Sequence, residues 1–234
     1  MTDLRVAPCS HTAAKLAVER WHYSGSLPTP PLVPFGVWQS SDFIGAVIFG
    51  RGATPDLFTP YGLDQTEGCE LVRVALRDHD APVSQIVAEA LRNLRVQSPG
   101  VRLVVSFADP AEGHHGGIYQ AGNWIYTGTS SPSTVYYDKA GRKWHGRQVS
   151  ATGIKRQYGE LRAVPKLSTL RRVSMPGKHR YLMPLDRAMR RQVTKLAQPY
   201  PQSADQVSMG DVQPTGRKGQ VRSLRSAPLA EASA

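Results

Sequence analysis

The stretch Ser106–Gly128, SFADPAEGHHGGIYQAGNWIYTG, decides the fold and carries most of the candidate chemistry. The apolar run Val101–Phe107, which overlaps its start, predicts a buried strand, and Trp124–Thr127 predicts another. Between them lie Asp109-Pro110, a cluster of glycines and histidines, and a short helical pattern over about 114–121. Acid, base and donor side chains therefore gather where a strand ends and a helix begins, which is where α/β folds place their sites.

Outward from this stretch, apolar periodicity predicts an alternation of strands and helices. The expected strands are 4–7, 35–39, 43–49, 70–76, 101–107, 124–128 and 134–138, and the expected helices are 12–21, 83–96 and 114–121. Beyond Lys139 the periodicity weakens, and a strand at 180–183 and a basic amphipathic helix at 186–196 are expected. The order predicts an α/β fold with a mixed central sheet flanked by helices.

The positive charge is concentrated in one part of the chain. Residues 1–141 hold 10 Lys and Arg against 13 Asp and Glu, whereas residues 142–200 hold 15 against 2. Such a block is typical of a surface that binds nucleic-acid phosphates, although a solvated basic face that only aids solubility gives the same count. Because Trp144, Tyr158 and Tyr181 lie among the charges and could stack on bases, we expect a nucleic-acid partner.

These patterns predict three segments. Residues 1–141 form the catalytic domain, residues 142–198 form a basic extension that packs on it and binds DNA, and the Pro-, Ser- and Gly-rich residues 199–234 form a disordered tail. No apolar run approaches the length of a membrane span, so no membrane partner is expected. Cys9 and Cys69 are far apart and are expected to be reduced, which fits a cytoplasmic protein.

Four motifs resemble the Mom family of bacteriophage DNA-modification proteins. They are Trp21–Gly25 (WHYSG), Glu70–Arg73 (ELVR), Phe107–Asp109 (FAD) and Gly113–Trp124 (GHHGGIYQAGNW). The order of elements is also similar to the GNAT acyltransferase fold, and Ile118–Gly128 resembles the tyrosine-bearing helix and the strand that close such domains. The resemblance covers about residues 10–185.

The resemblance implies a phage enzyme that transfers a carbamoylmethyl, acetamido-type group to N6 of adenine in double-stranded DNA and so protects the DNA from host restriction. It implies a place in the host cytoplasm during infection, a flipped-out adenine, and a small-molecule group donor, acetyl-CoA or another. Iron(II) is implied as a cofactor, with His22 and Tyr23 as its ligands. Carried onto the matching positions, the implied catalytic residues are His22, Tyr23, Arg73, Asp109 and Tyr119.

The residue types fit a reaction at a poorly nucleophilic amine, which needs a base, a polarised donor, or both. Asp109 is the candidate base, because burial beyond the strand should raise the pKa of its carboxyl group; the other interpretation is a turn residue that caps the next segment. Tyr119 is either a proton donor or an aromatic packed under the sheet. Arg73, on a strand among apolar neighbours, needs an anion, and both Glu70 and a ligand fit.

Further residues are expected to hold the DNA. Trp124 and Tyr126 could stack on a flipped base, although core packing is the default interpretation of Trp124. The expected DNA-binding residues are Arg142, Lys143, Arg147, Lys155 and Arg156 of the basic block, with His114 and His115 of the glycine-flanked loop.

Two other functions fit parts of the pattern. A GNAT-type acetyltransferase acting on protein or small-molecule amines needs a coenzyme A site, usually a glycine-rich turn at a helix N-terminus. Here the matching turn, Arg77–Pro82, has no glycine, and Asp78 and Asp80 are expected to cap the helix and compete with phosphate. A non-catalytic DNA-binding protein explains the basic block but gives Asp109 and Tyr119 no role.

Overall fold

The structure, a computed structural model, describes residues 3–52, 54–157 and 159–202. The helices are α1 (His11–Trp21), α2 (Val83–Gln97), α3 (Gly117–Ala121) and α4 (Arg187–Thr194). The strands are β1 (Leu4–Pro8), β2 (Leu32–Gln39), β3 (Asp42–Gly50), β4 (Gly68–Leu76), β5 (Leu103–Ala108), β6 (Ile125–Thr129), β7 (Ser133–Tyr137), β8 (Lys143–His145), β9 (Ile154–Gln157), β10 (Glu160–Ala163), β11 (Arg171–Met175) and β12 (His179–Pro184). None of the helices in these residues is long and apolar enough to cross a membrane.

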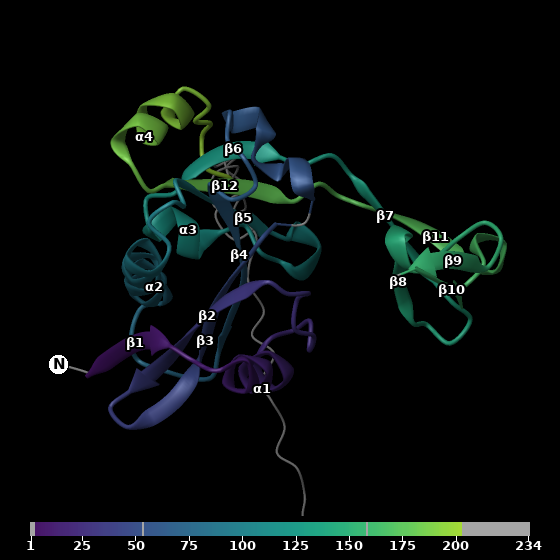
Figure 1. Cartoon of the computed structure of the whole chain (residues 1–234), viewed down its shortest axis with the longest axis horizontal. Coiled ribbons are helices and arrows are strands. Elements are labelled where there is room, and N and C mark those ends of the chain that lie inside the picture. The colour runs from purple at the N-terminus through teal and green to yellow at the C-terminus, as the bar shows by residue number, and fades with distance from the viewer. Residues whose placement is uncertain (1–2, 53, 158, 203–234) are drawn as a thin grey trace, which may run out of the picture. The chain divides into compact units, whose positions relative to one another are not determined.

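The main sheet has seven strands in the order β1-β2-β3-β4-β5-β12-β6 (Figure 1). All neighbours are antiparallel except β4 and β5, which run parallel. The mixed sheet flanked by helices that the sequence predicts for a GNAT-like domain is confirmed. The strands 4–7, 35–39, 43–49 and 70–76 and the helices 12–21 and 83–96 are also found, with ends shifted by a few residues at most.

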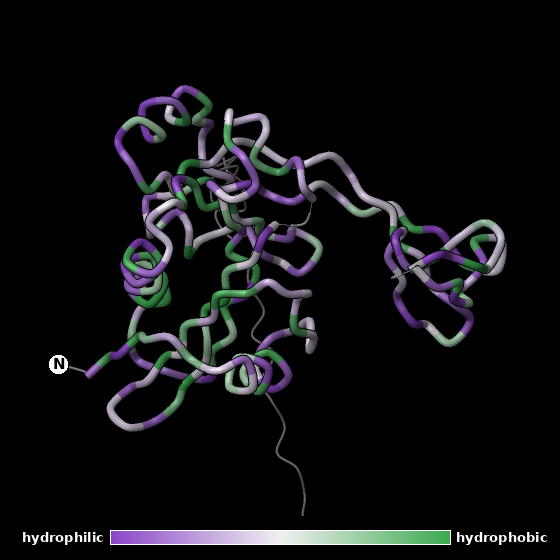
Figure 2. Tube along the Cα trace, viewed as in Figure 1, coloured by the Kyte–Doolittle hydropathy of each residue, from purple (hydrophilic) through white to green (hydrophobic). Residues whose placement is uncertain are grey.

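Helices cover both faces of this sheet, and the side-chain alternation of β3 separates the two faces. Ala46 and Ile48 pack with α1, whereas Val47 and Phe49 belong to the cluster formed with α2. The inner side of α2 supplies Ile86, Val87, Ala90, Leu91 and Leu94, all buried. Hydrophobic residues accordingly follow the strands of the main sheet and one side of α2 in Figure 2.

The predicted boundary at residue 141 does not separate the sheet from an extension. The strand β12 comes from the segment 142–198, yet it lies between β5 and β6, and its Tyr181 and Leu182 are fully buried. The helix α4 then packs Met189 and Val193 against β5 and β12. Hydrophobic burial thus places the end of this basic segment inside the domain, and residues 1–201 form one compact unit.

The residues between β6 and β12 form a separate set of strands, which we call the basic module (residues 133–175). The strands β11, β7 and β8 make one sheet, and β9 pairs only with β10, so no module strand pairs with the main sheet. The module carries ten Lys and Arg against two Asp and Glu. Weak periodicity hid the strands β8 to β11 from the sequence prediction, because short strands with exposed side chains lack an alternating apolar pattern.

The tail predicted for 199–234 begins with residues that are packed. The Tyr200 hydroxyl donates to the Trp124 carbonyl at 2.7 Å, and the Gln120 side chain donates to the Pro201 carbonyl at 3.1 Å. The predicted disorder beyond residue 202 lies outside the described residues.

The parallel strands β4 and β5 part from each other in the middle of the sheet. They pair from Gly68 with Leu103 to Leu71 with Ser106, and each then continues without pairing to the other. On its other side, where it pairs with β3, β4 carries a bulge. Arg73 is paired with Ile48 and Leu71 with Phe49, so Val72 is the extra residue of the bulge. The parting strands open a cleft, and the bulge sets the direction of the side chains along one of its walls.

The two chain segments that join the basic module to the main sheet are tightly packed at Gly177. A methyl group there would collide with the Ser130 carbonyl oxygen. We expect Gly177→Ala to lower the free energy of unfolding by about 1–3 kcal/mol, because backbone must move to admit it. Gly146→Ala is the matched control, since a methyl group there meets no atom within 4 Å. Urea unfolding measures both variants, and equal stability of the two would contradict the packing described.

Candidate functional site

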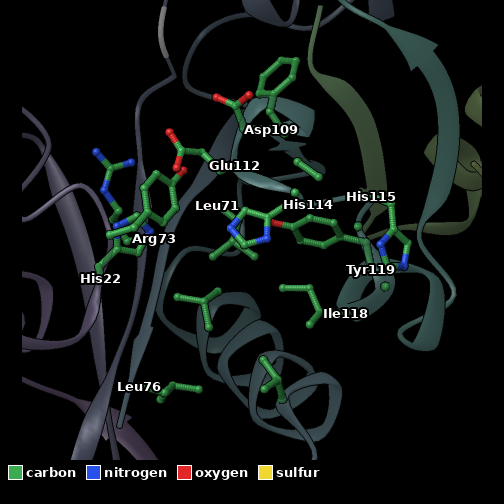
Figure 3. Close-up of a pocket in the computed structure, with 18 of the residues that line it drawn as sticks. His22, Leu71, Arg73, Leu76, Asp109, Glu112, His114, His115, Ile118 and Tyr119 are labelled. Carbon is green, nitrogen blue, oxygen red and sulfur yellow. The ribbon is translucent and has the colours of Figure 1, made fainter. Parts of the chain in front are cut away.

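The parted ends of β4 and β5 border a cavity of about 750 Å³. All five residues expected to be catalytic, His22, Tyr23, Arg73, Asp109 and Tyr119, line it, together with His114 and His115. In Figure 3, Asp109 and Glu112 lie at one end and Leu76 and Ile118 at the other, while Tyr119 points from one side toward His22 and Arg73. Motifs far apart in the sequence thus meet in one pocket.

His22 and Tyr23 lie together because α1 ends at Trp21 and His22 has an extended backbone. Their rings stack with centroids 4.3 Å apart, and Tyr23, 61% exposed, also faces His114 with centroids 5.6 Å apart. Burial, followed by the positive charges of Arg73 and His114, lowers the pKa of His22 from 6.5 to about 4. His22 is therefore neutral at pH 7, and Tyr23, whose pKa burial raises, remains a phenol.

The donor set does not fit the implied iron site. The His22 Nδ1 lies 2.9 Å from Ser24 Oγ and 3.1 Å from the Ser24 backbone nitrogen, so this ring nitrogen is already hydrogen-bonded within its own turn, and the neighbouring Tyr23, whose pKa is raised by burial, is a phenol and not a phenolate. Within the described residues, no group of three or more His, Cys, Asp or Glu side chains is arranged to hold a metal ion.

Arg73 lies on β4 immediately after the bulge and lines one side of the pocket (Figure 3). Its guanidinium donates to the carbonyl oxygens of Val72 at 2.7 Å and Ser26 at 3.4 Å, and its buried Nε has no hydrogen-bond partner. Burial lowers the pKa of Arg73, while Glu70, and Tyr23 when it is ionised, act the other way. A buried guanidinium donor without an acceptor is suited to a carbonyl or anionic group of a ligand.

Asp109 follows β5, caps the turn Pro110–Glu112 as one of the two interpretations expected, and also lines the pocket, while its role as a base stays a prediction. One carboxylate oxygen accepts from the Ala111 N–H at 3.1 Å, and the other lies 2.8 Å from Lys178 Nζ. The expected upward shift of its pKa is wrong. Burial does act to raise the pKa of Asp109, but the hydrogen bond and charge of Lys178, with smaller help from Ala111 and Lys143, lower it overall.

Tyr119 is buried at the base of the pocket against Ser106. The Ser106 hydroxyl lies 2.9 Å from the Leu71 carbonyl oxygen and 2.8 Å from the Tyr119 oxygen, but it has only one proton to donate. When that proton goes to Tyr119, the Tyr119 proton is free to point into the pocket. Burial raises the pKa of Tyr119 to about 12, so its hydroxyl is a proton donor at neutral pH.

The glycine-flanked loop holds His114 exposed and His115 partly buried beside the pocket. Gly116 has a φ of +91°, and a side chain there would collide with the Tyr181 ring. The Tyr181 hydroxyl donates to the His115 carbonyl oxygen at 2.6 Å. The sheet thereby fixes the path of the loop, and the fully buried Tyr181 is a core residue, contrary to the expectation that it stacks on bases.

The other expected stacking aromatics divide between the core and the basic module. Trp124 and Tyr126 are only 1% and 8% exposed, so core packing, the default interpretation of Trp124, is correct for both. Trp144 donates to Asp138 at 3.0 Å beneath the Arg142 guanidinium, and Tyr158 lies outside the described residues. Tyr23 is the pocket aromatic that remains exposed enough to stack on a base.

The basic residues expected to bind DNA fall in the basic module. Arg142, Lys143, Arg147 and Arg156 are exposed, and Lys155 is partly buried. Lys155 on β9 lies opposite Arg162 on β10 in a ribbon that pairs with no other strand. No structural feature tests their binding to DNA, so this assignment stays a prediction.

The expected capping of α2 by acidic residues is wrong. The N-cap is Pro82 and has no side-chain cap hydrogen bond, while the Asp80 carboxylate accepts from the Gln39 side chain at 2.6 Å. Hydrogen bonding to β2 therefore draws Asp80 away from the helix. The pocket extends to His79 and Val83, so the N-terminus of α2 borders its apolar end.

Sequence reasoning missed three polar residues of the site. Lys178 comes from the connection before β12, Ser106 from inside β5, and Glu112 from the turn after Asp109. Ser106 and Glu112 belong to the stretch 106–128 that decides the fold, and polarity inside an apolar strand signals Ser106. Nothing in the sequence around Lys178 indicates its contact with Asp109.

The fold and the site define a mixed α/β domain whose pocket opens where two parallel strands part and is lined by Arg73, Asp109 and Tyr119. A family model described as the Mom protein family matches residues 3–202, and the chain belongs to this family. The chain is 31% identical over 210 residues to the protein named Methylcarbamoylase mom of Escherichia phage Mu, covering 85% of this chain and 84% of that one.

Solved structures are also similar to the chain. An acetyltransferase from Thermus thermophilus has a TM-score of 0.40 at 15% identity, covering 79% of this chain and 98% of its own. An N-acyl amino acid synthase from uncultured soil microbes has a TM-score of 0.45 at 11% identity, covering 82% and 95%. A Bacillus subtilis acetyltransferase in complex with CoA has a TM-score of 0.41 at 9% identity, covering 79% and 100%.

The lowered pKa of His22 gives a pH dependence with a definite sign. Since the pKa falls from 6.5 to about 4 on folding, the unfolded chain binds the proton more readily, and His22 destabilises the fold as the pH falls through this range. We expect nitrogen NMR to find the His22 ring neutral at pH 6. The spectrum of His22→Gln assigns the signal, and titration of this ring above pH 6 would overturn the described surroundings.

Proposed function

We propose that the chain is a transferase that adds a carbamoylmethyl group to N6 of adenine in double-stranded DNA and thereby protects phage DNA from host restriction. The observation that carries the proposal is that all four Mom-like motifs contribute side chains to one pocket. The relative from phage Mu is named a methylcarbamoylase, which supports transfer of a group of this type.

The pocket supplies the groups that such a transfer needs. A bond forms between N6 and the donor carbon, the bond from that carbon to its leaving group breaks, and the amine loses one proton. In this proposal Asp109 accepts the proton, Tyr119 donates a proton to the leaving group, and Arg73 binds the carbonyl oxygen of the transferred group. The neutral His22 ring, whose Nδ1 is hydrogen-bonded to Ser24, lies beside these groups in the pocket lining.

The paired adenine must leave the duplex to reach these groups, because N6 lies inside the helix. The exposed ring of Tyr23, beside His22 and His114 in the pocket lining, is suited to stack on the flipped base. The basic module supplies the backbone contacts that hold the duplex without reading its sequence.

An acetyltransferase acting on protein or small-molecule amines is the second candidate. The observation that favours it is the absence of a side-chain cap on α2, whose first N–H groups border the apolar end of the pocket and are suited to a donor phosphate. Acetyl-CoA turnover on a simple amine, with no change in DNA, would establish it in place of the first. A non-catalytic DNA-binding role requires tight DNA binding without any product.

The first test is nucleoside mass spectrometry of DNA from cells that express the protein. We expect a carbamoylmethyl adduct on adenosine and resistance of the DNA to several restriction enzymes. Asp109→Asn and Tyr119→Phe should each lower the adduct by about 10²-fold or more, the usual contribution of a positioned acid or base. Unmodified adenosine in the wild-type digest would refute the proposal.

Tyr126→Phe is the matched control for Tyr119→Phe. Tyr126 is an equally buried tyrosine of the same core, but its hydroxyl lies 3.1 Å from His179 Nδ1 and does not line the pocket. Its adduct level should stay close to that of the wild type. Equal losses in both variants would show that Tyr119 acts only through packing.

The role of the basic module in DNA binding is tested by the salt dependence of affinity. We expect Lys155→Gln with Arg156→Gln to weaken binding to a labelled duplex and to reduce the slope of log affinity against log salt by about 2, because each contributes one phosphate contact. Fluorescence anisotropy between about 50 and 200 mM salt measures the slope. Arg95→Gln on the exposed side of α2 is the control, and an equal change in both proteins would contradict the assignment.

A further inference from the structure

The pocket carboxylate Asp109 is tied to the residue at which the chain returns from the basic module. Lys178 Nζ lies 2.8 Å from the Asp109 carboxylate, and this residue stands between β11 and β12. The side chain of Lys178 is 45% exposed, whereas that of Asp109 is 14% exposed. The Lys178 side chain is therefore more accessible to a large solute than the carboxylate with which it pairs.

The backbone of Lys178 is held by hydrogen bonds that do not involve its ion pair with Asp109. The Ser130 N–H donates to the Lys178 carbonyl oxygen at 2.8 Å, and the Lys178 N–H donates to the Ser130 hydroxyl at 3.0 Å. Gly177 packs directly on the Ser130 carbonyl. These bonds join the outgoing and returning segments of the module, so the Lys178 ammonium can exchange partners without a change of backbone.

Lys178 also belongs to the group of cations around β8. The pKa of His145 is lowered by burial and then by the charges of Lys143, Arg147 and Lys178. Lys143 and Lys178 both act on Asp109 as well. One lysine thus lies within electrostatic range of the pocket carboxylate and of the residues proposed to receive a phosphate backbone.

We propose that Lys178 is a positioning residue that couples duplex binding to the pocket: a backbone phosphate takes up its ammonium group and leaves the Asp109 carboxylate as the proton acceptor. The inference rests on the proposed function, in which a DNA duplex is the substrate. Without DNA, Asp109 is paired and is a weak base. When a duplex is bound, its phosphate neutralises the charge of Lys178. Asp109 therefore becomes a stronger base only when the substrate is in place.

The groups that face Asp109 show why the exchange changes its chemistry. Lys178 and Lys143 favour its charged form, as does the Ala111 N–H, while burial favours the neutral form. The Tyr23 phenol, whose pKa Asp109 helps to raise, is the remaining titratable neighbour on the α1 side. If a phosphate neutralises Lys178, burial is opposed only by the two weaker contributions, and the pKa of Asp109 rises toward values useful in a base.

The test follows the Asp109 carboxyl carbon by NMR in the full-length protein labelled with ¹³C-carboxyl aspartate, with Asp109→Asn to assign the signal. Titrations are made with and without a duplex oligonucleotide, and without any group donor, so that no turnover occurs. We expect Lys178→Met to shift the midpoint upward without DNA and Lys178→Arg to retain the low value. In the wild type the duplex should raise the midpoint, and in Lys178→Met it should raise it much less.

Arg172→Gln on β11 is the control, because it removes an exposed cation of the same module that does not act on Asp109. Its titration should match that of the wild type. An unchanged midpoint in Lys178→Met, or an equal rise with the duplex in wild type and Lys178→Met, would overturn the coupling. The titration needs no group donor, so a missing adenine adduct in expressing cells would refute the proposed function and leave this measurement as an independent result.

Discussion

The structure depends on the separation of β4 from β5 after Leu71 and Ser106. Two parallel strands that stop pairing inside a sheet leave a gap that must be filled or used. Here Ser106 closes its inner end by hydrogen bonding to the Leu71 carbonyl oxygen and to Tyr119. The same contact fixes Tyr119 at the base of the cleft. The strand ends beyond this point then carry Arg73 and Asp109 to facing walls of the pocket.

The topology explains how a basic module can be part of a compact domain. The chain leaves the main sheet after β6 and returns in β12, which is the neighbour of β6, so both ends of the module are fixed by one pair of antiparallel strands. Hydrophobic burial of Tyr181 and Leu182 stabilises that pair. Among the described residues of the module, the buried hydrophobic ones are Val135 and Val149, so its short strands have little core of their own.

Most of the main sheet could be predicted from the sequence because its strands and helices have strong apolar periodicity, as in β3 and α2. The pocket could be predicted in outline, since four local motifs supply His22, Tyr23, Arg73, Asp109 and Tyr119. The central place of β12 could not, because strand order depends on long-range pairing that leaves no local pattern. The prediction that the pKa of Asp109 is raised was wrong for a similar reason. Burial was visible from the apolar strand, whereas the opposing cation, Lys178, lies in a distant part of the chain.

The ion pair of Asp109 with Lys178 joins a mostly buried carboxylate to a half-exposed side chain. A carboxylate at 14% exposure that had no cation would bind a proton more readily and lose the charge that the pocket holds. A fully buried lysine would also keep Asp109 ionised. Separating such a pair would cost much free energy, because it would leave buried charges without a partner. The Lys178 side chain is instead nearly half exposed, so water or a phosphate can interact with its ammonium group when the pair with Asp109 separates. The asymmetry of the pair therefore permits an exchange of partners that a symmetric buried pair would resist.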